Sequence, residues 1–414
     1  MRVHQLVPPI GETGLQQVVE NLSSAHNLPP FAGPIVDFCS DFSRALFKDP
    51  EARRFPELQA LAFWLRKSEI VRLQREFERL ATPDTIMVPR GVVFHVPPAN
   101  VDTIFLYSWA LSALTGNRNI IRISPRVSIQ SSILVRVFST VLDAAPPEMR
   151  GNTVMIRYGH EREITEAISR VSDVRVIWGG DRSIEAIRSI PLPPHAKELT
   201  FPDRHSISAI NAVPYLTLDT TGRRGLAHGF YNDLFWFDQM ACSSPRLLIW
   251  CGDQEQRLRA QSVFWEVLAE HLREHPYLSQ PATSIQKFTA ACRVMLDQDI
   301  TSYRTYGGSI TVLEMDGLET FVRASQGGGM IFETGLGCLR DIVPFIVRRD
   351  QTLSCSGFTA DEIREVVRCL NGRGLDRIVP IGSALSFHRF WDGYDLLQEM
   401  CRRVFIDPSI ASAT

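Results

Sequence analysis

One cysteine stands where its neighbours would allow it to react. Cys242 follows a run of bulky aromatic residues and is flanked by the small residues Ala241, Ser243 and Ser244. A thiol that does covalent chemistry needs access from one side, a rigid position, and nearby backbone N–H groups that favour the thiolate. Because free cysteine is among the most buried residue types, the alternative is a structural cysteine before the apolar strand expected over 246–250.

A second candidate side chain is Asn100. It ends the segment Pro97-Pro98-Ala99-Asn100, which interrupts an apolar strand expected over 91–96. An asparagine amide can donate to a developing oxyanion, and one such donor is typically worth about 2.7–4 kcal/mol of barrier. Asparagine is also a common helix N-cap, and a helix is expected over 102–115. Both roles are open at this point.

Two glycine-containing segments could approach a phosphate. The turn Trp178-Gly179-Gly180-Asp181 joins an expected strand to an expected helix. Glycines let the backbone come close to a phosphate, and a helix N-terminus favours negative charge. The turn lacks the full G-x-G-x-x-G pattern, so a plain tight turn is the alternative. The run 325–329 is expected to be a flexible loop, with a phosphate cradle as the minor alternative.

Cations follow the second expected strand. Arg122 and Ser124 lie at the end of the strand over 119–124, Arg126 comes next, and no Asp or Glu occurs between Asn117 and Gln130. Sites selective for NAD usually place an acid there for the ribose 2′-hydroxyl, whereas a cation accommodates a 2′-phosphate. If a dinucleotide binds, the local charge favours NADPH. The alternative is a pair of solvated arginines.

The segment His271-Leu272-Arg273-Glu274-His275 matches the H-x-x-E-H pattern of some zinc peptidases. It is expected at the end of a long helix over 254–274, because Pro276 follows directly. Histidines at that position complement the helix dipole. The sequence offers no obvious third ligand, so no metal site is predicted.

The elements that would position these residues alternate regularly. Strands are expected over 91–96, 119–124, 154–158 and 174–178, and helices over 102–115, 128–144 and 161–171. Such alternation indicates βαβ units on a parallel sheet. Sheets of this kind bind ligands beyond the carboxyl ends of their strands. Residues 1–33 show no strong period and are expected to lie over the surface.

Composition excludes several classes of function. The chain has 414 residues and a formal net charge of −2, which gives no electrostatic reason to bind nucleic acid. No apolar stretch reaches the ~18 residues of a membrane span, and the N-terminus lacks a signal-peptide pattern, so a cytoplasmic location is expected. The 8 cysteines form no CxxC pair and are expected to be free thiols.

With these residues in view, the chain resembles the LuxC-type acyl-CoA reductases, a branch of the aldehyde dehydrogenase superfamily. Three segments carry the likeness: Val93–Pro125, which includes Asn100 and the run 116–125; Asp238–Ser244; and Leu375–Gly382 together with Trp391–Leu396. The resemblance implies an aldehyde dehydrogenase-like α/β fold with a Rossmann-type cofactor domain, an α/β catalytic domain and a helical N-terminal region. The expected boundaries are 1–88 for the mostly helical N-terminal region, 89–235 for the NADP-binding domain, 236–385 for the catalytic domain, and 386–414 for a C-terminal segment.

The resemblance also implies an activity. Cys242 would form an acyl-cysteine from an acyl-CoA, an acyl-protein thioester or an acyl adenylate, Asn100 would stabilise the oxyanion, and NADPH would reduce the acyl group to an aldehyde. The cofactor would contact Arg122, Ser124, Trp178, Gly179, Gly180 and Asp181. An acyl-protein synthetase partner and self-association into oligomers are implied as well.

One departure from the superfamily pattern bears on the direction of the reaction. Aldehyde-oxidising members carry a Glu base in an "ELGGK" segment, whereas this chain reads Glu198-Leu199-Thr200-Phe201-Pro202, and an ungapped alignment puts Thr200 at the base. Hydrolysis of an acyl-enzyme needs that base, but release of an aldehyde does not. Reduction is therefore favoured, and a role for Glu198 is left open. The alternatives are a cysteine acyltransferase and a non-redox subunit of an acyl-activating complex.

Overall fold

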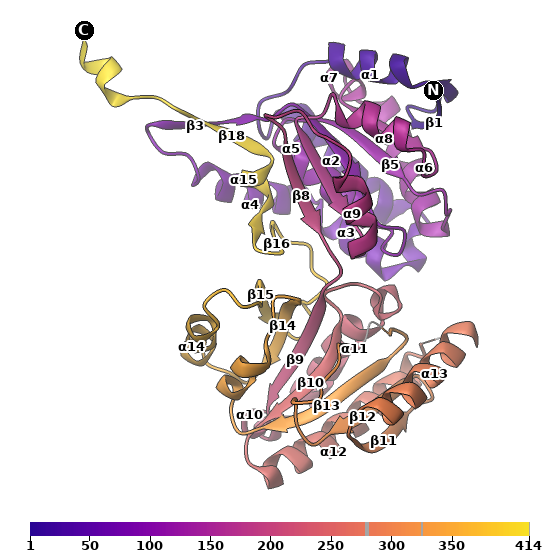
Figure 1. Cartoon of the computed structure of the whole chain (residues 1–414), viewed down its shortest axis with the longest axis vertical. Coiled ribbons are helices and arrows are strands. Elements are labelled where there is room, and N and C mark those ends of the chain that lie inside the picture. The colour runs from indigo at the N-terminus through magenta and orange to yellow at the C-terminus, as the bar shows by residue number, and fades with distance from the viewer. Residues whose placement is uncertain (278–280, 324–325, 414) are drawn as a thin grey trace. The chain divides into compact units, whose positions relative to one another are not determined.

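The computed structural model describes residues 1–277, 281–323 and 326–413. The chain forms two compact units (Figure 1). Unit 1 contains residues 1–202 and 387–414, and unit 2 contains residues 203–386. The chain therefore enters unit 2 after Pro202, earlier than the boundary near residue 235 that the sequence predicted, and residues 387–414 return to unit 1.

Unit 1 is built on a seven-stranded sheet in the order β2-β1-β6-β5-β4-β7-β8. Strands β4, β5, β6, β7 and β8 are parallel, as the alternation of strands and helices predicted. The strands are β1 (Arg2–Val7), β2 (Gly11–Gly14), β4 (Val92–Val96), β5 (Arg118–Ile123), β6 (Thr153–Arg157), β7 (Val174–Trp178) and β8 (Lys197–Phe201).

The N-terminus differs from the sequence prediction. Residues 1–33 were expected to lie over the surface, but β1 pairs antiparallel with β6 and extends the sheet. The burial of β1 alternates, with Val3, Gln5 and Val7 buried. Period-two alternation is typical of a strand with one face on a core. The rest of the N-terminal region is mostly helical, as expected: α1 (Leu15–Ser24), α2 (Gly33–Lys48), α3 (Pro56–Trp64) and α4 (Lys67–Glu78).

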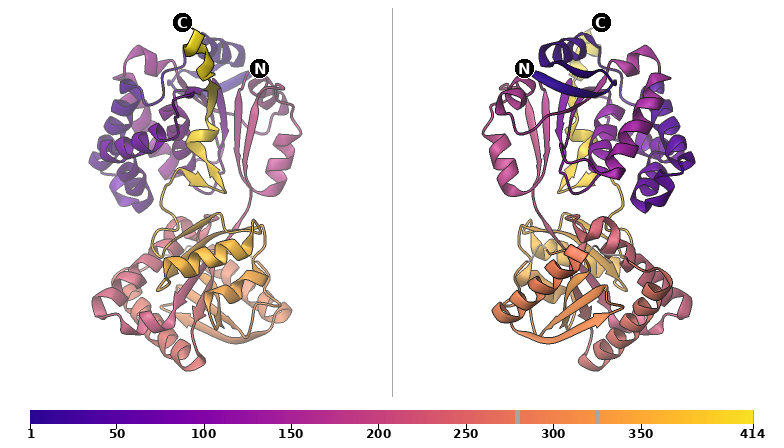
Figure 2. Two further views of the ribbon diagram at one scale, coloured as in Figure 1. Left: turned by 90° about the vertical axis from the view of Figure 1, so that its left-hand side faces the viewer. Right: turned by 90° about the vertical axis from the view of Figure 1, so that its right-hand side faces the viewer.

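Helices cover both faces of this sheet (Figure 2). Apolar side chains of α1, α8 (Arg162–Ser169) and α9 (Asp181–Arg188) pack on one face against β4 and β6. The helix α5 (Ile104–Leu114) is buried along its whole length and packs on the other face of the sheet. There Ser108 Oγ of α5 lies 2.8 Å from His95 Nδ1 of β4. Helix α5 also packs against α6 (Ile129–Asp143), where the rings of Trp109 on α5 and Phe138 on α6 lie 4.7 Å apart.

Small elements complete unit 1. The turn helix α7 (Pro147–Arg150) precedes β6. The strand β18 (Cys401–Phe405), from the C-terminal segment, pairs antiparallel with β3 (Thr85–Pro89). The short strands β16 (Phe390–Trp391) and β17 (Tyr394–Asp395) form a separate pair, followed by α15 (Leu396–Glu399).

Unit 2 is also an α/β unit. Its seven-stranded sheet has the order β11-β12-β13-β10-β9-β14-β15, and only β11 is antiparallel to its neighbour. The strands are β9 (His205–Asn211), β10 (Pro245–Cys251), β11 (Ile300–Tyr306), β12 (Ile310–Met315), β13 (Met330–Leu336), β14 (Asp350–Ser356) and β15 (Arg377–Pro380).

Two apolar layers enclose the second sheet. One is formed with α10 (Ala212–Thr217), α11 (Thr220–Phe235) and α12 (Gln254–Glu274). The other is formed with α13 (Pro281–Asp297), the 3-10 helix η3 (Leu339–Phe345) and α14 (Ala360–Leu370). Because β9 is a central strand of this sheet and α11 packs on it, residues 203–235 belong to unit 2 and not to unit 1.

Among the described residues, no helix combines the length and apolar character that a bilayer crossing requires.

Candidate active site

A cavity of about 900 Å³ opens at the carboxyl ends of β4, β5 and β7 in unit 1. Six of the residues that the sequence predicted for cofactor binding or catalysis line it: Asn100, Arg122, Ser124, Trp178, Gly179 and Gly180. These residues come from loops far apart in the sequence, and the parallel sheet brings them together because all three strands point to the same edge.

The cavity is strongly cationic. Its lining contains Arg122, Arg126, Arg162, Arg182 and His160, and none of the described lining residues is Asp or Glu. Arg162, Arg182 and His160 were not singled out from the sequence. They come from α8, from α9 and from the loop after β6, so no strand-end pattern marked them. Such a surface favours a ligand with several negative charges.

Several of these arginines are held in place by protein groups. Arg122 donates from Nη2 to the carbonyl of Gly159, and its guanidinium carbon lies 4.8 Å from the centre of the Tyr158 ring. Arg162 donates from Nη1 to Ser189 Oγ at 2.9 Å. Ser124 Oγ accepts the backbone N–H of Arg126 at 3.1 Å, which shapes the turn after β5. The cations are thus partly fixed before any ligand binds.

The turn at Gly179 and Gly180 leaves open space in the lining of the cavity. A Cβ added to Gly180 would meet no atom within 4 Å, so the fold itself leaves free space there. Gly180 is the N-cap of α9 and supplies no side-chain cap to the helix. Trp178 stacks on Phe201, with ring centroids 3.7 Å apart. Asp181, which was predicted to contact the cofactor, is the exposed first residue of α9 and does not line the cavity.

The structure separates the two roles considered for Asn100. Helix α5 begins at Ile104 and its N-cap is Thr103, so Asn100 is not the N-cap. Asn100 is exposed at the rim of the cationic cavity. Its N-cap role is therefore excluded, and a role toward a ligand remains a prediction.

The Glu198 carboxylate accepts hydrogen bonds from two arginines. Its two carboxylate oxygens accept from Arg175 Nε at 2.7 Å and from Arg188 Nε at 3.1 Å. Arg175 is buried and also donates to Ser169 Oγ at 3.0 Å. The Glu198 carboxylate on β8 is thus occupied by side chains of β7 and α9.

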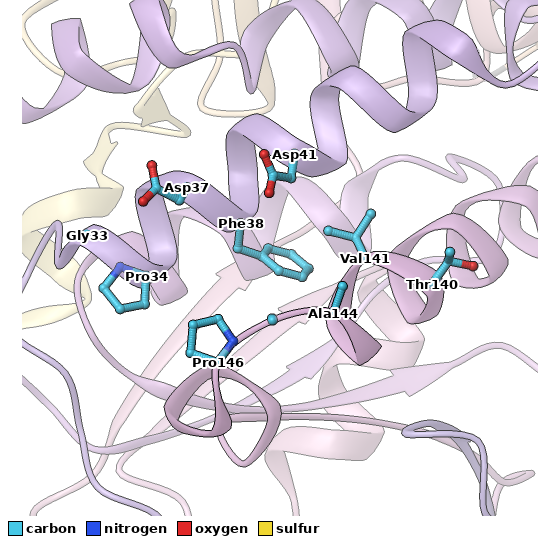
Figure 3. A pocket seen from close by; sticks show the side chains of 10 residues that line it. Gly33, Pro34, Asp37, Phe38, Asp41, Thr140, Val141, Ala144 and Pro146 are labelled. Carbon is cyan, nitrogen blue, oxygen red and sulfur yellow. The ribbon is translucent and has the colours of Figure 1, made fainter.

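A second cavity, of about 460 Å³, lies between α2 and the end of α6. In Figure 3 the Phe38 ring lies among Val141, Ala144 and Pro146, with Asp37 and Asp41 above it. The lining contains no Lys or Arg among the described residues. Its charge is therefore opposite to the one that a nucleotide phosphate needs.

Cys242 lies in unit 2, on the loop between α11 and β10, and its side chain is half-buried. Ser206 Oγ donates to the Cys242 carbonyl at 2.7 Å. Burial lowers the pKa of the nearby Arg246, while the negative charges of Asp203 and of Cys242 as thiolate act in the opposite direction. The Arg246 guanidinium is therefore close enough to attract negative charge on the sulfur.

The backbone before Cys242 has an unusual conformation. Phe237, Asp238 and Gln239 have φ values of 56°, 53° and 61°, three successive residues in the left-handed region. Residues other than glycine rarely adopt this region, and never in long runs. The aromatic run therefore does not continue as a helix into the cysteine, and the chain turns sharply before it.

Gln239 holds this turn, and the sequence analysis did not identify it. Its side chain is fully buried. Nε2 donates to the carbonyls of Pro245 at 2.8 Å and Met330 at 2.9 Å, and Oε1 accepts the N–H of Gly329 at 2.9 Å. Arg246 Nη2 donates to the Gln239 carbonyl at 3.0 Å. In the sequence, Gln239 is the second of two polar residues that separate the aromatic run from the cysteine.

The glycines at 327–329 pack against the same turn. Ser325 lies outside the described residues, but Gly327, Gly328 and Gly329 are described. Gly328 donates its N–H to the Asp238 carbonyl at 2.9 Å. A Cβ at Gly327 would lie 2.5 Å from that same carbonyl oxygen. These glycines therefore allow the backbone at 327–329 to contact the backbone before Cys242 closely. They support the cysteine loop (residues 240–244), whereas a flexible loop was expected for the run 325–329.

The Gln239 contacts lead to a stability prediction. We expect Gln239→Ala to lower the free energy of unfolding by about 2–4 kcal/mol, because it leaves buried backbone groups at three residues without a partner. Urea unfolding of the full chain measures the change. Gln17→Ala on the exposed face of α1 is the control and should change the value by less than about 0.5 kcal/mol. Equal unfolding midpoints for the two variants would contradict the anchoring role.

Comparison with solved structures identifies the fold. Lactaldehyde dehydrogenase superposes with a TM-score of 0.66 at 12% identity, covering 98% of this chain and 95% of that chain. The glyceraldehyde-3-phosphate dehydrogenase GapN of Methanocaldococcus jannaschii, solved in complex with NADP, gives a TM-score of 0.64 at 11% identity and covers 98% of both chains. The fold is thus that of the aldehyde dehydrogenases, as the resemblance implied.

Sequence relatives are more specific. The long-chain acyl-protein thioester reductase 2 of Photobacterium leiognathi is 29% identical over 189 residues, 45% of this chain and 36% of that protein. The long-chain acyl-protein thioester reductase of Photorhabdus laumondii is 24% identical over 304 residues, 71% of this chain and 58% of that protein. The matched part of the chain thus spans about a third to three fifths of the length of these relatives. The family model described as acyl-CoA reductase (LuxC) matches residues 69–403, so the chain belongs to the LuxC acyl-CoA reductase family.

Proposed function

We propose that the chain reduces an activated long-chain acyl group to an aldehyde, with NADPH as the reductant and an acyl-Cys242 intermediate. The observation that carries the proposal is the cavity at the carboxyl edge of the unit 1 sheet, with four arginines and no described carboxylate in its lining. Family membership gives the acyl substrate class, and the related proteins named above are acyl-protein thioester reductases.

The residues present fit a phosphorylated dinucleotide. Arg122 lies near the carboxyl end of β5 and Arg126 follows that strand, where a cation suits a ribose 2′-phosphate. Gly179 and Gly180 leave free space before the first turn of α9, where backbone N–H groups favour a pyrophosphate. NADPH, when bound, supplies the hydride. The protein's part is to bind and orient it.

The chemistry on the protein side begins at the sulfur. The Cys242 thiolate attacks the acyl carbonyl carbon, the bond to the donor breaks, and the donor leaves as a thiolate or a phosphate that takes up a proton from solvent. The Asn100 amide and the Cys242 backbone N–H stabilise the oxyanion. After hydride addition, the tetrahedral oxyanion collapses, the carbon–sulfur bond breaks, the aldehyde leaves and the thiolate re-forms.

No hydrolytic base is needed in this direction. The ion pairs of Glu198 with Arg175 and Arg188 support a structural role for that carboxylate. Thr200, on β8, cannot act as a carboxylate base. The absence of a general base at this segment slows hydrolysis of an acyl-cysteine and so favours reduction.

The proposal is tested by following NADPH absorbance with acyl-CoAs of increasing chain length. We expect one aldehyde formed per NADPH consumed, with the highest rate for long chains. Transfer of the acyl group to a thiol or amine acceptor with no NADPH consumption would favour the cysteine acyltransferase and overturn the reductase. Failure of iodoacetamide to label Cys242 would favour the non-redox subunit.

The cofactor preference gives a second prediction. We expect Arg122→Glu to raise the KM for NADPH by about 10- to 100-fold, because the new carboxylate repels the 2′-phosphate. The KM for NADH should change little, and this comparison also reports a correctly folded site. Arg170→Glu is a matched control, since Arg170 is exposed on the surface and does not line the cavity. An unchanged ratio of the two KM values would refute the role of Arg122.

The proposal extends to two kinds of protein partner. The resemblance implies an acyl-protein synthetase and further copies of this chain. In support, the ribbon of β3 and β18 exposes the apolar residues Ile86, Val404 and Phe405. Analytical ultracentrifugation of the chain alone and with such a synthetase tests both contacts, and a monomer that binds neither would refute them.

A further inference from the structure

Three histidines from two helices converge on the surface of unit 2. His271 lies in the last turn of α12 and His275 is its C-cap. His228 lies on α11, which packs against α12 through the buried pair Phe230 and Phe264. The sequence pattern contained only His271 and His275, and the missing third ligand is supplied by a helix far away in the sequence.

The distances suit a shared ion. His228 Nδ1 lies 3.4 Å from His271 Nε2. Zinc–nitrogen bonds of about 2.0–2.1 Å in a tetrahedral site place two ligand nitrogens about 3.3–3.4 Å apart. One ligand atom each of His271, Glu274 and His275 lies within 4.8 Å of the others. His228 is not part of that group and approaches it through His271, so its ring must turn toward the other three ligands to complete the site.

A neighbouring side chain can orient one of the four proposed ligands, His228. Asn232, one turn after His228, has its amide nitrogen 3.2 Å from His228 Nε2, so it can orient that ring through the nitrogen that does not face His271. The amide can present its oxygen there after a flip.

We propose that His228, His271, His275 and Glu274 bind a divalent transition-metal ion, with Zn²⁺ as the best match to the three nitrogens and one carboxylate oxygen. Imidazole ligands select zinc, copper, nickel and cobalt over magnesium and calcium. The site would join the end of α12 to α11. It is independent of the proposed reduction, because no step of that chemistry uses these residues.

The site has a structural connection to the cysteine loop. The Tyr231 ring lies 5.0 Å from the His271 ring and 5.0 Å from the Phe235 ring. Phe235 in turn packs on Tyr277 at 4.3 Å, and the Tyr277 hydroxyl donates to Asp238 Oδ1 at 2.5 Å. An ion that fixes α11 against α12 would thus stabilise the support of the turn before Cys242.

Isothermal titration of the full chain with ZnCl₂ tests the proposal. The protein must carry no polyhistidine tag and must first be treated with a chelator. We expect one Zn²⁺ per chain and a rise in Tm of about 5 °C or more at saturating ion. His271→Ala should abolish this binding, and His228→Ala should weaken it by at least about tenfold. His195→Ala is the control, because His195 is exposed elsewhere on the chain and should not affect binding.

A Co²⁺ spectrum gives a readout of coordination that a folding defect does not imitate. We expect strong d–d absorption, typical of tetrahedral Co²⁺, in the wild type and in His195→Ala, and its loss in His228→Ala and in the conservative His228→Gln variant. Circular dichroism confirms that each variant is folded. The proposal is overturned if the wild type binds no stoichiometric Zn²⁺, if His271→Ala retains the site, or if His228→Ala binds as tightly as the wild type.

Discussion

Cys242→Ala is expected to abolish both acyl-enzyme formation and NADPH oxidation, with residual turnover below about a thousandth of the wild-type rate. The reason is that no other group on the cysteine loop can form the thioester. Intact-protein mass spectrometry after mixing with an acyl-CoA detects the covalent adduct, and NADPH absorbance measures turnover.

The other cysteines supply internal controls for this experiment. Burial raises the pKa of Cys39, Cys251 and Cys401 to about 12 and that of Cys355 to about 11. These thiols stay protonated at pH 7–9 and should resist iodoacetamide. Labelling should therefore concentrate on the more accessible cysteines.

Substrate protection then separates Cys242 from the rest. Cys338 is exposed, so it should be alkylated at the same rate with and without acyl-CoA. Cys242 should be alkylated only without it. Peptide mapping by mass spectrometry measures both rates in one sample. An acyl adduct that persists in Cys242→Ala, or protection of Cys338 in place of Cys242, would refute the assignment of the nucleophile.

The second large effect is expected at Asn100. Asn100→Ala should lower kcat for NADPH-dependent reduction by about 100- to 1,000-fold, equivalent to about 2.7–4 kcal/mol of lost oxyanion stabilisation. The KM for NADPH should change little, because the amide acts on the acyl group. Single-turnover kinetics with a preformed acyl-enzyme measures the chemical step directly.

Stability separates this role from a structural one. Because Thr103 and not Asn100 is the N-cap of α5, Asn100→Ala should not lower the free energy of unfolding by the amount that loss of an N-cap does. Removal of an N-cap would cost about 1 kcal/mol. A variant that is less stable by that amount but retains its kcat would contradict the oxyanion role.

Much of the cofactor site could be predicted from the sequence because it depends on local rules. Asn100, Arg122 and Gly179 all lie at or just after the carboxyl ends of apolar strands, and parallel strands place these ends at one edge. Arg162 and Arg182 could not be predicted in the same way. They lie on helices, and which face of a helix meets the cavity depends on how that helix packs.

Other features depended on long-range pairing. The burial of β1 alternates in the structure, with Val3, Gln5 and Val7 buried. One of these three residues is polar, and prolines and glycines follow the strand, so the sequence pattern did not predict it. Strand β9 continues the strand–helix alternation of unit 1 in sequence but pairs with β10 and β14. The boundary between the units therefore could not be located from local pattern alone. The role of Gln239 depends on partners up to 91 residues away.

The three left-handed residues before Cys242 have a consequence for thermal behaviour. Each costs about 1–2 kcal/mol relative to ordinary backbone, and the buried Gln239 side chain opposes their relaxation. Heating that breaks the Gln239 hydrogen bonds would release this strain, so we expect the segment to rearrange while both sheets remain intact. Inactivation of the chain would then precede its unfolding, and the temperature range of activity would be set by one turn of backbone.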